Sequence, residues 1–245
     1  MSSEEKSNGN DQSNECSSNY EDISYQVYPD RTGKVTSTNW AENYVKVRCQ
    51  SKIGKAIESS PLVKLLMSAL KSKGCEIDLN RHIVCENCSE DVTGGYDTSA
   101  NQIVVCQNRV YTQQMTQAVI GHELIHMFDY CRAKMDFTNL EHIACSEIRA
   151  ANLVHCSMVS SMFIGTTKPW NIASTHRECV KAKALASLMA VRKNFPITEA
   201  MAVVDKVFDR CYADLEPIGR RIRLNSNHIK WAYRERFHYD YDSMF

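Results

Sequence analysis

The sequence predicts an α+β fold that is mostly helical, with a small β element beside one long helix. Two short runs, residues 82–85 and 103–106, have the composition of strands and flank the segment Gly94-Gly95-Tyr96-Asp97. Most of the remaining chain shows the apolar repeat of helices. A few clustered strands followed by a run of helices are typical of an α+β domain.

Apolar stripes and end signals place the helices along the chain. One leucine stripe begins after Pro61 and stops at Gly74, a residue that commonly ends helices. Pro196 opens the last helix of the series in the same way. The predicted helices cover residues 40–57, 61–72, 113–134, 141–159, 175–193 and 197–215.

The length and composition of the chain indicate how it is divided into domains. The chain has 245 residues, of which 43% are hydrophobic, which is enough for one substantial core. The N-terminal stretch is polar and acidic, so we expect a disordered tail over residues 1–24 and a single domain over 25–245. The formal net charge is +0, so we expect no direct contact with nucleic acid. No apolar run is long enough to predict a membrane-spanning helix.

The motif that carries most information is His122-Glu123-Leu124-Ile125-His126, inside the helix predicted over 113–134. This H-E-x-x-H string also occurs by chance on ordinary amphipathic helices. Histidines four apart stand on one helix face, so both can reach one zinc ion. Glu123 lies about 100° round the helix from His122, where its carboxylate can take a proton from a water on the metal. The pattern therefore predicts a zinc hydrolase with His122 and His126 as ligands and Glu123 as catalytic base.

The motif is preceded by Gly121, which costs about 1 kcal/mol relative to alanine in a helix interior. A glycine at this position indicates that another element packs closely against the helix beside the predicted zinc site.

The sequence does not decide which residue is the third protein ligand of the zinc ion. The metzincin pattern needs glycine at position 129 and histidine at 132, but the chain has Asp129 and Arg132, which excludes that class. Three candidates remain: Glu147, His142 and Asp129. We favour Glu147, because a glutamate on a following helix completes the common His₂Glu zinc site. Asp129, one turn after His126, would instead suit an outer role in which it holds a ligand imidazole.

Eleven cysteines are many for a reducing compartment. Cys16 lies in the predicted tail, and the ten others allow five disulfides or a set of buried free thiols. Cys145 and Cys156 lie about 16 Å apart along the helix predicted there, too far to pair with each other. Cys85-x-x-Cys88 is compatible with a zinc half-site, a redox pair or a local bridge, and we favour structural bridging.

The C-terminal stretch alternates basic and aromatic residues. Such a mixture suits an anionic membrane surface. It equally fits a solvated helix whose aromatic side packs on the domain, and we favour this second interpretation. The aromatic residues are Trp231, Tyr233, Phe237, Tyr239 and Tyr241.

Taken together, these residues resemble a family of mitochondrial inner-membrane zinc metallopeptidases that process a membrane subunit of ATP synthase, also labelled Ku-binding proteins. The resemblance rests on 121–126, Asp129, the segment 142–150, Gly94-Gly95-Tyr96 and the spread of cysteines, and it covers most of residues 30–240.

The resemblance implies a zincin-like endopeptidase on the intermembrane-space side, attached peripherally to the inner membrane. Its substrate or client would be a subunit of the ATP synthase membrane sector. The alternatives are a non-proteolytic assembly chaperone and a Ku-associated interaction protein.

Overall fold

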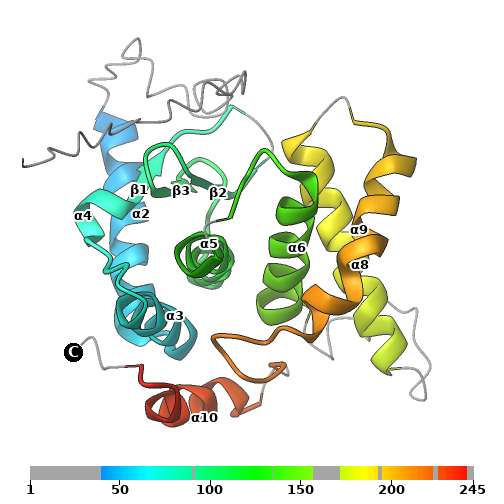
Figure 1. Cartoon of the computed structure of the whole chain (residues 1–245). Helices are drawn as coiled ribbons and strands as arrows, with labels where there is room; N and C mark the ends of the chain where they lie inside the picture. The colour runs from blue at the N-terminus through cyan, green and yellow to red at the C-terminus, as the bar shows by residue number, and fades with distance from the viewer. Residues whose placement is uncertain are drawn as a thin grey trace, which may run out of the picture.

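A computed structural model describes residues 40–89, 92–133, 135–156, 172–192, 195–222 and 226–241. The tail predicted over 1–24 lies outside these residues. Helix α5 (Gln113–Ala133) runs through the middle of the molecule and is seen end-on in Figure 1. On one side it packs against α2 (Trp40–Ser59) and α3 (Pro61–Ser72), and on the other against α6 (Leu140–Ala150).

Helix α3 forms where the sequence predicts it. Ser60 caps its first turn, since its Oγ accepts a hydrogen bond from the Val63 N–H, and Pro61 occupies the first turn without losing a bond. Beyond its end Gly74 adopts φ +83°, a left-handed conformation that glycine takes at little cost.

The sheet has three strands in the order β1–β3–β2: β1 (Ile83–Glu86), β2 (Gly94–Asp97) and β3 (Gln102–Cys106). β1 runs parallel to β3, and β2 runs antiparallel to it. The short helix α4 (Leu79–His82) precedes β1.

Two predicted segments differ from the structure. We expected two strands around 94–97, but this segment is itself a strand, β2, at one edge of the sheet. A side chain at Gly94 would meet Val119 of α5 and the Val104 carbonyl of β3, so glycine is what lets β2 lie against both.

The helix expected over 141–159 ends its α-helical part at Ala150 and continues as a π turn, η2 (Ala151–His155). Residues 157–159 lie outside the described residues. Helices α8 (Ile172–Val191) and α9 (Ile197–Ala213) pack against α6 and build a second apolar core around Val180, Leu188 and Phe208.

The last described elements are α10 (His228–Glu235), which packs on α3, and the short helix η4 (Arg236–Tyr239). Among the helices described, none is both long and apolar enough to cross a membrane.

The ten cysteines outside the predicted tail form five disulfides, so they are not buried free thiols. Cys145 and Cys156 pair with different partners, as expected. Cys85 and Cys88 both take part in structural disulfides, as favoured, but not with each other. Cys85 of β1 is bonded to Cys49 of α2, and Cys88, just after β1, is bonded to Cys106 of β3. The two therefore form neither a local bridge nor a zinc half-site. The pairs are Cys49–Cys85, Cys75–Cys131, Cys88–Cys106, Cys145–Cys211 and Cys156–Cys179.

Five bridges among eleven cysteines predict one free thiol, Cys16. Thiol titration of the oxidised protein, unfolded without reductant, should therefore give about one reactive group per chain. Titration of most of the eleven would contradict the bridged structure and indicate a reduced protein.

Candidate metal centre and active site

Helix α5 carries the two motif histidines with their Nε2 atoms facing each other, 3.1 Å apart. The side chains are 15% and 8% exposed, so the pair is largely shielded from solvent. The close packing predicted at Gly121 is present: a Cβ there would lie 3.1 Å from Leu62 Cδ2 and 3.5 Å from Val154 Cγ1. Glycine thus lets α3 and η2 approach the helix directly beside His122.

Helix α6 places the Glu147 carboxylate beside the Nε2 atoms of the two motif histidines. Its Oε2 lies 3.5 Å from His122 Nε2, and its Oε1 lies 3.4 Å from His126 Nε2. The two alternative ligands point elsewhere. His142 is exposed, and its Nδ1 accepts a hydrogen bond from the Asp136 N–H. Asp129 binds Ser146 and Arg149 instead of the histidine pair.

The donor set fits a divalent metal ion. Burial alone would raise the pKa of Glu147, but the neighbouring His126 and His122 lower it to about 2, so the carboxylate is ionised. Its Oε2 is buried and makes no hydrogen bond of good geometry within the described residues. A buried, charged oxygen without a well-aligned hydrogen bond costs free energy that a metal ion would offset. Two imidazole nitrogens and one carboxylate are a donor set typical of catalytic zinc.

Glu123 is a second carboxylate within reach of the histidines. His122, Glu123 and His126 have ligand atoms within 4.8 Å of one another. Of the two carboxylates, Glu147 faces both Nε2 atoms, whereas Glu123 turns toward β2 and accepts a backbone hydrogen bond from Tyr96. Burial raises the pKa of Glu123 above its usual range. A raised pKa suits a carboxylate that accepts a proton near neutral pH.

An outer hydrogen-bond chain fixes His126. When Nε2 is free for a metal, Nδ1 carries the proton and donates it to Ser146 Oγ at 2.7 Å. Ser146 in turn donates to Asp129 Oδ2 at 2.9 Å. Asp129 therefore orients the imidazole, as its sequence position suggested, but through a serine that the sequence did not single out.

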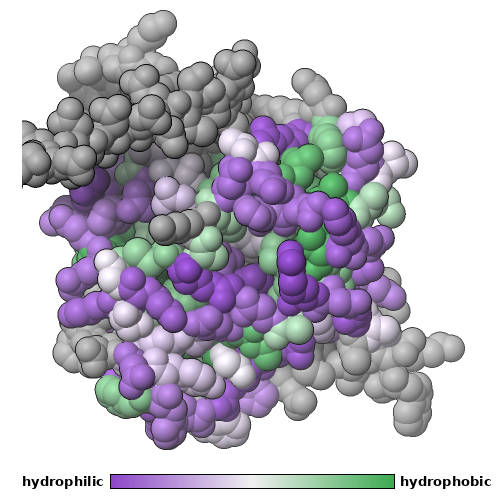
Figure 2. Space-filling view, viewed as in Figure 1, coloured by the Kyte–Doolittle hydropathy of each residue, from purple (hydrophilic) through white to green (hydrophobic). Residues whose placement is uncertain are grey.

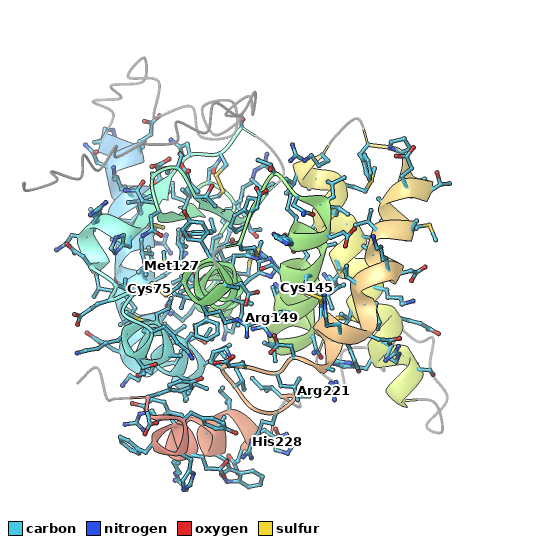
Figure 3. All side chains as sticks on the ribbon, viewed as in Figure 1. Cys75, Met127, Cys145, Arg149, Arg221 and His228 are labelled. Carbon is cyan, nitrogen blue, oxygen red and sulfur yellow. A yellow bond between two sulfur atoms is a disulfide. The ribbon has the colours of Figure 1, made fainter. Side chains whose placement is uncertain are left out.

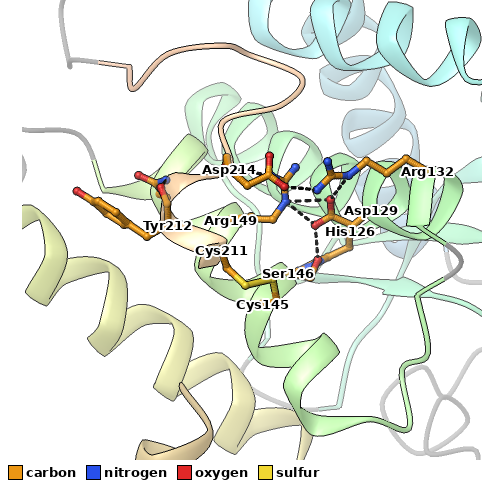
Figure 4. The surroundings of a disulfide bond; sticks show 10 residues. His126, Asp129, Arg132, Cys145, Ser146, Arg149, Cys211, Tyr212 and Asp214 are labelled. Atoms are coloured by element: carbon orange, nitrogen blue, oxygen red, sulfur yellow. Dashed lines mark hydrogen bonds and ion pairs between the residues drawn. A yellow bond between two sulfur atoms is a disulfide. The ribbon is translucent and has the colours of Figure 1, made fainter. Parts of the chain in front are cut away.

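Arg149 binds the Asp129 end of this hydrogen-bond chain (Figure 4). The side chain is 1% exposed, and its Nε donates to both oxygens of Asp129, at 2.9 and 3.0 Å. Its other nitrogens reach the Asp214 carboxylate and the backbone carbonyls of Asp214 and Glu216. Figure 3 shows Arg149 between α5 and α6. One buried cation thus ties both α5 and α6 to the turn after α9.

The outer nitrogen of His122 has a partner as well. His155, on the π turn η2, places its Nε2 2.9 Å from His122 Nδ1. The sequence offered no signal for this contact, because 33 residues separate the two histidines.

The profile of the Peptidase M76 family matches residues 47–219 of the chain. The chain belongs to this family. A Danio rerio relative is 42% identical over 221 residues, which is 89% of this chain and 85% of the relative. A Homo sapiens relative is 41% identical over 221 residues, with 87% of each chain covered. Both are named mitochondrial inner membrane protease ATP23 homolog.

A Schizosaccharomyces pombe relative, named mitochondrial inner membrane protease atp23, is 34% identical over 183 residues, or 74% of this chain and 96% of the relative. No solved structure matches the chain significantly. Membership of the family confirms the resemblance and the prediction of a metallopeptidase. The names of the relatives agree with the expected association with mitochondria and their inner membrane.

The Arg149 contacts predict a large stability effect. Replacing Arg149 by Met removes the cation and leaves the Asp129 carboxylate buried without its main partner, which should cost about 3–5 kcal/mol. Denaturant unfolding of the oxidised protein would measure the loss. The matched control is Lys71→Ala, because the Lys71–Glu76 pair is 39% and 66% exposed and should contribute only about 0–1 kcal/mol. Equal, small losses in both variants would contradict the assigned role of Arg149.

Proposed function

We propose that the protein is a zinc-dependent endopeptidase with a zincin-like active site. The observation that carries the proposal is the convergence of the two Nε2 atoms with the buried carboxylate of Glu147, next to the buried Glu123. His122, His126 and Glu147 would hold the ion. When bound, zinc supplies Lewis-acid activation of water and of the scissile carbonyl. Glu123 accepts the proton of the attacking water and returns it to the leaving amine.

Strand β2 supports an extended peptide substrate. It is one of the two edge strands of the described sheet and lies directly against α5. An extended peptide can add to such an edge through main-chain hydrogen bonds, which would carry its scissile bond past the histidines. Because Tyr96 of β2 binds Glu123, the strand that would align the substrate also orients the base.

For the substrate we propose a membrane-sector subunit of ATP synthase, cleaved near its N-terminus on the intermembrane-space side. This rests on the resemblance of the motif segments and on the relatives named as inner membrane proteases. The protein would also assist assembly of that sector.

The C-terminal helices offer a membrane-contacting face. Tyr241 is buried, as the packed-helix interpretation predicts, but Trp231, Phe237 and Tyr239 are 45%, 58% and 51% exposed. Lys230 and Arg234 are exposed on the same helical segment. In Figure 2 the surface over α10, at the bottom of the view, is mostly hydrophilic with paler residues between. Exposed aromatic rings among basic side chains suit the headgroup region of an anionic bilayer.

The central prediction concerns Glu123. Because Glu123 acts as a base rather than a ligand, Glu123→Gln should lower turnover by about 10²-fold or more while zinc content stays at that of the unchanged protein. Glu147→Gln should lower the zinc content instead. Cleavage of the candidate subunit by purified protein, with zinc measured by atomic emission, checks both.

Full turnover by Glu123→Gln would overturn the assigned mechanism. In cells lacking the protein, normal ATP synthase assembly restored by Glu123→Gln would show that the assembly role does not need hydrolysis.

The membrane face predicts selective binding to anionic vesicles. Trp231→Ala combined with Phe237→Ala should weaken binding to phosphatidylglycerol vesicles by about tenfold or more, because each ring loses its apolar contact. Trp40→Ala, which removes an exposed ring from α2, is the control and should change little. Co-sedimentation measures both, and equal losses in the two variants would place the contact elsewhere.

A further inference from the structure

His155 lies where it can control the orientation of a metal ligand. Its Nε2 is 2.9 Å from His122 Nδ1, and the two ring centroids are 4.8 Å apart. His122 therefore contacts His126 and Glu147 through Nε2 and contacts His155 through Nδ1. Ligating histidines usually give this outer N–H to a carboxylate, a carbonyl or water. Here the outer partner is a second imidazole.

The proton arrangement follows from the ligand role. When His122 offers its Nε2 lone pair to a metal, its Nδ1 carries the proton and donates it. His155 Nε2 must then be an acceptor, so His155 is the neutral imidazole with its proton on Nδ1.

The π turn explains why His155 reaches this place. At about 100° per residue, seven residues complete nearly two turns, so Val154 would follow Glu147 on the same face of a regular helix. In η2 the Cys156 N–H donates to the Ala151 carbonyl, an i→i+5 hydrogen bond. A turn of this kind is wider and contains one residue more than an α-helical turn, so the residue on the Glu147 face moves from position 154 to position 155. It thereby brings His155 toward the face that carries Glu147.

A disulfide fixes the end of this turn. Cys156 directly follows His155 and is bonded to Cys179 of α8. Its side chain is 2% exposed. The turn therefore lies between α6, which supplies Glu147, and a covalent link to α8, and this leaves His155 little freedom to swing away from His122.

We propose that His155 is a positioning residue that orients ligand His122 for zinc, and that the Cys156–Cys179 bridge holds His155 in place. The inference rests on the proposed function, in that His122 must be a ligand. It assigns His155 no contact with substrate. Its consequence is that zinc affinity depends on a residue outside the H-E-x-x-H motif and on one particular disulfide.

The test is zinc affinity, measured on the full oxidised chain by competition with a chelator of known affinity. His155→Ala should weaken zinc binding by about 10- to 100-fold, the range for loss of an outer partner of a ligand. His155→Gln should restore much of the affinity, because its side-chain carbonyl can accept the His122 Nδ1 proton. The absorption bands of the cobalt-substituted protein should shift in His155→Ala and return toward normal in His155→Gln.

His142→Ala is the matched control, since it removes an exposed α6 histidine that contacts the Asp136 backbone; its zinc affinity and cobalt spectrum should equal those of the unchanged protein. The double variant Cys156→Ser with Cys179→Ser should weaken zinc binding, and adding His155→Ala to it should weaken binding little further.

Zinc affinity of His155→Ala within twofold of the unchanged protein would overturn the proposal, as would a loss that His155→Gln does not relieve. Failure of the unchanged protein to bind zinc would instead overturn the proposed function, so the two failures are distinguishable.

Discussion

The buried contact between Arg149 and Asp129 is the constraint on which the site depends. An arginine that is 1% exposed cannot remain without partners, and here it is satisfied by Asp129 on α5 and by the turn after α9. The cost of burying these charges is offset only if the geometry is kept, so the contact sets where α6 lies on α5. That placement in turn brings Glu147 to the two histidines.

The disulfides divide the described molecule into two halves. Three of them join α2, the sheet, the segment after α3 and the end of α5. The other two join α6 and η2 to α9 and α8. None of these five crosses from one half to the other. The halves meet where α5 faces α6, through the Arg149 contacts and apolar packing of residues such as Leu153. A zinc ion held by both helices would add a further link and stabilise the folded chain by its binding free energy.

Local signals were sufficient for the long helices and for the central motif, but not for the short helix α4. Ser60-Pro61 and Gly74 marked the ends of α3, and the spacing of His122 and His126 placed both imidazoles on one face. The strand at Gly94-Gly95 was missed because glycine is a poor strand former, and what stabilises it is contact with Val119 and Val104. The roles of Ser146, Arg149 and His155 depend on partners 17 to 67 residues away, which a single sequence does not pair. The π turn was missed because the apolar repeat continues through it.

The most direct test of this account is a crystal structure of the zinc-loaded protein with anomalous diffraction data at the zinc edge. The account predicts one peak between His122 Nε2, His126 Nε2 and a Glu147 carboxylate oxygen, with Glu123 beside the metal but outside its ligands. A peak bound by His142 or Asp129, or with Glu123 in place of Glu147, would contradict it.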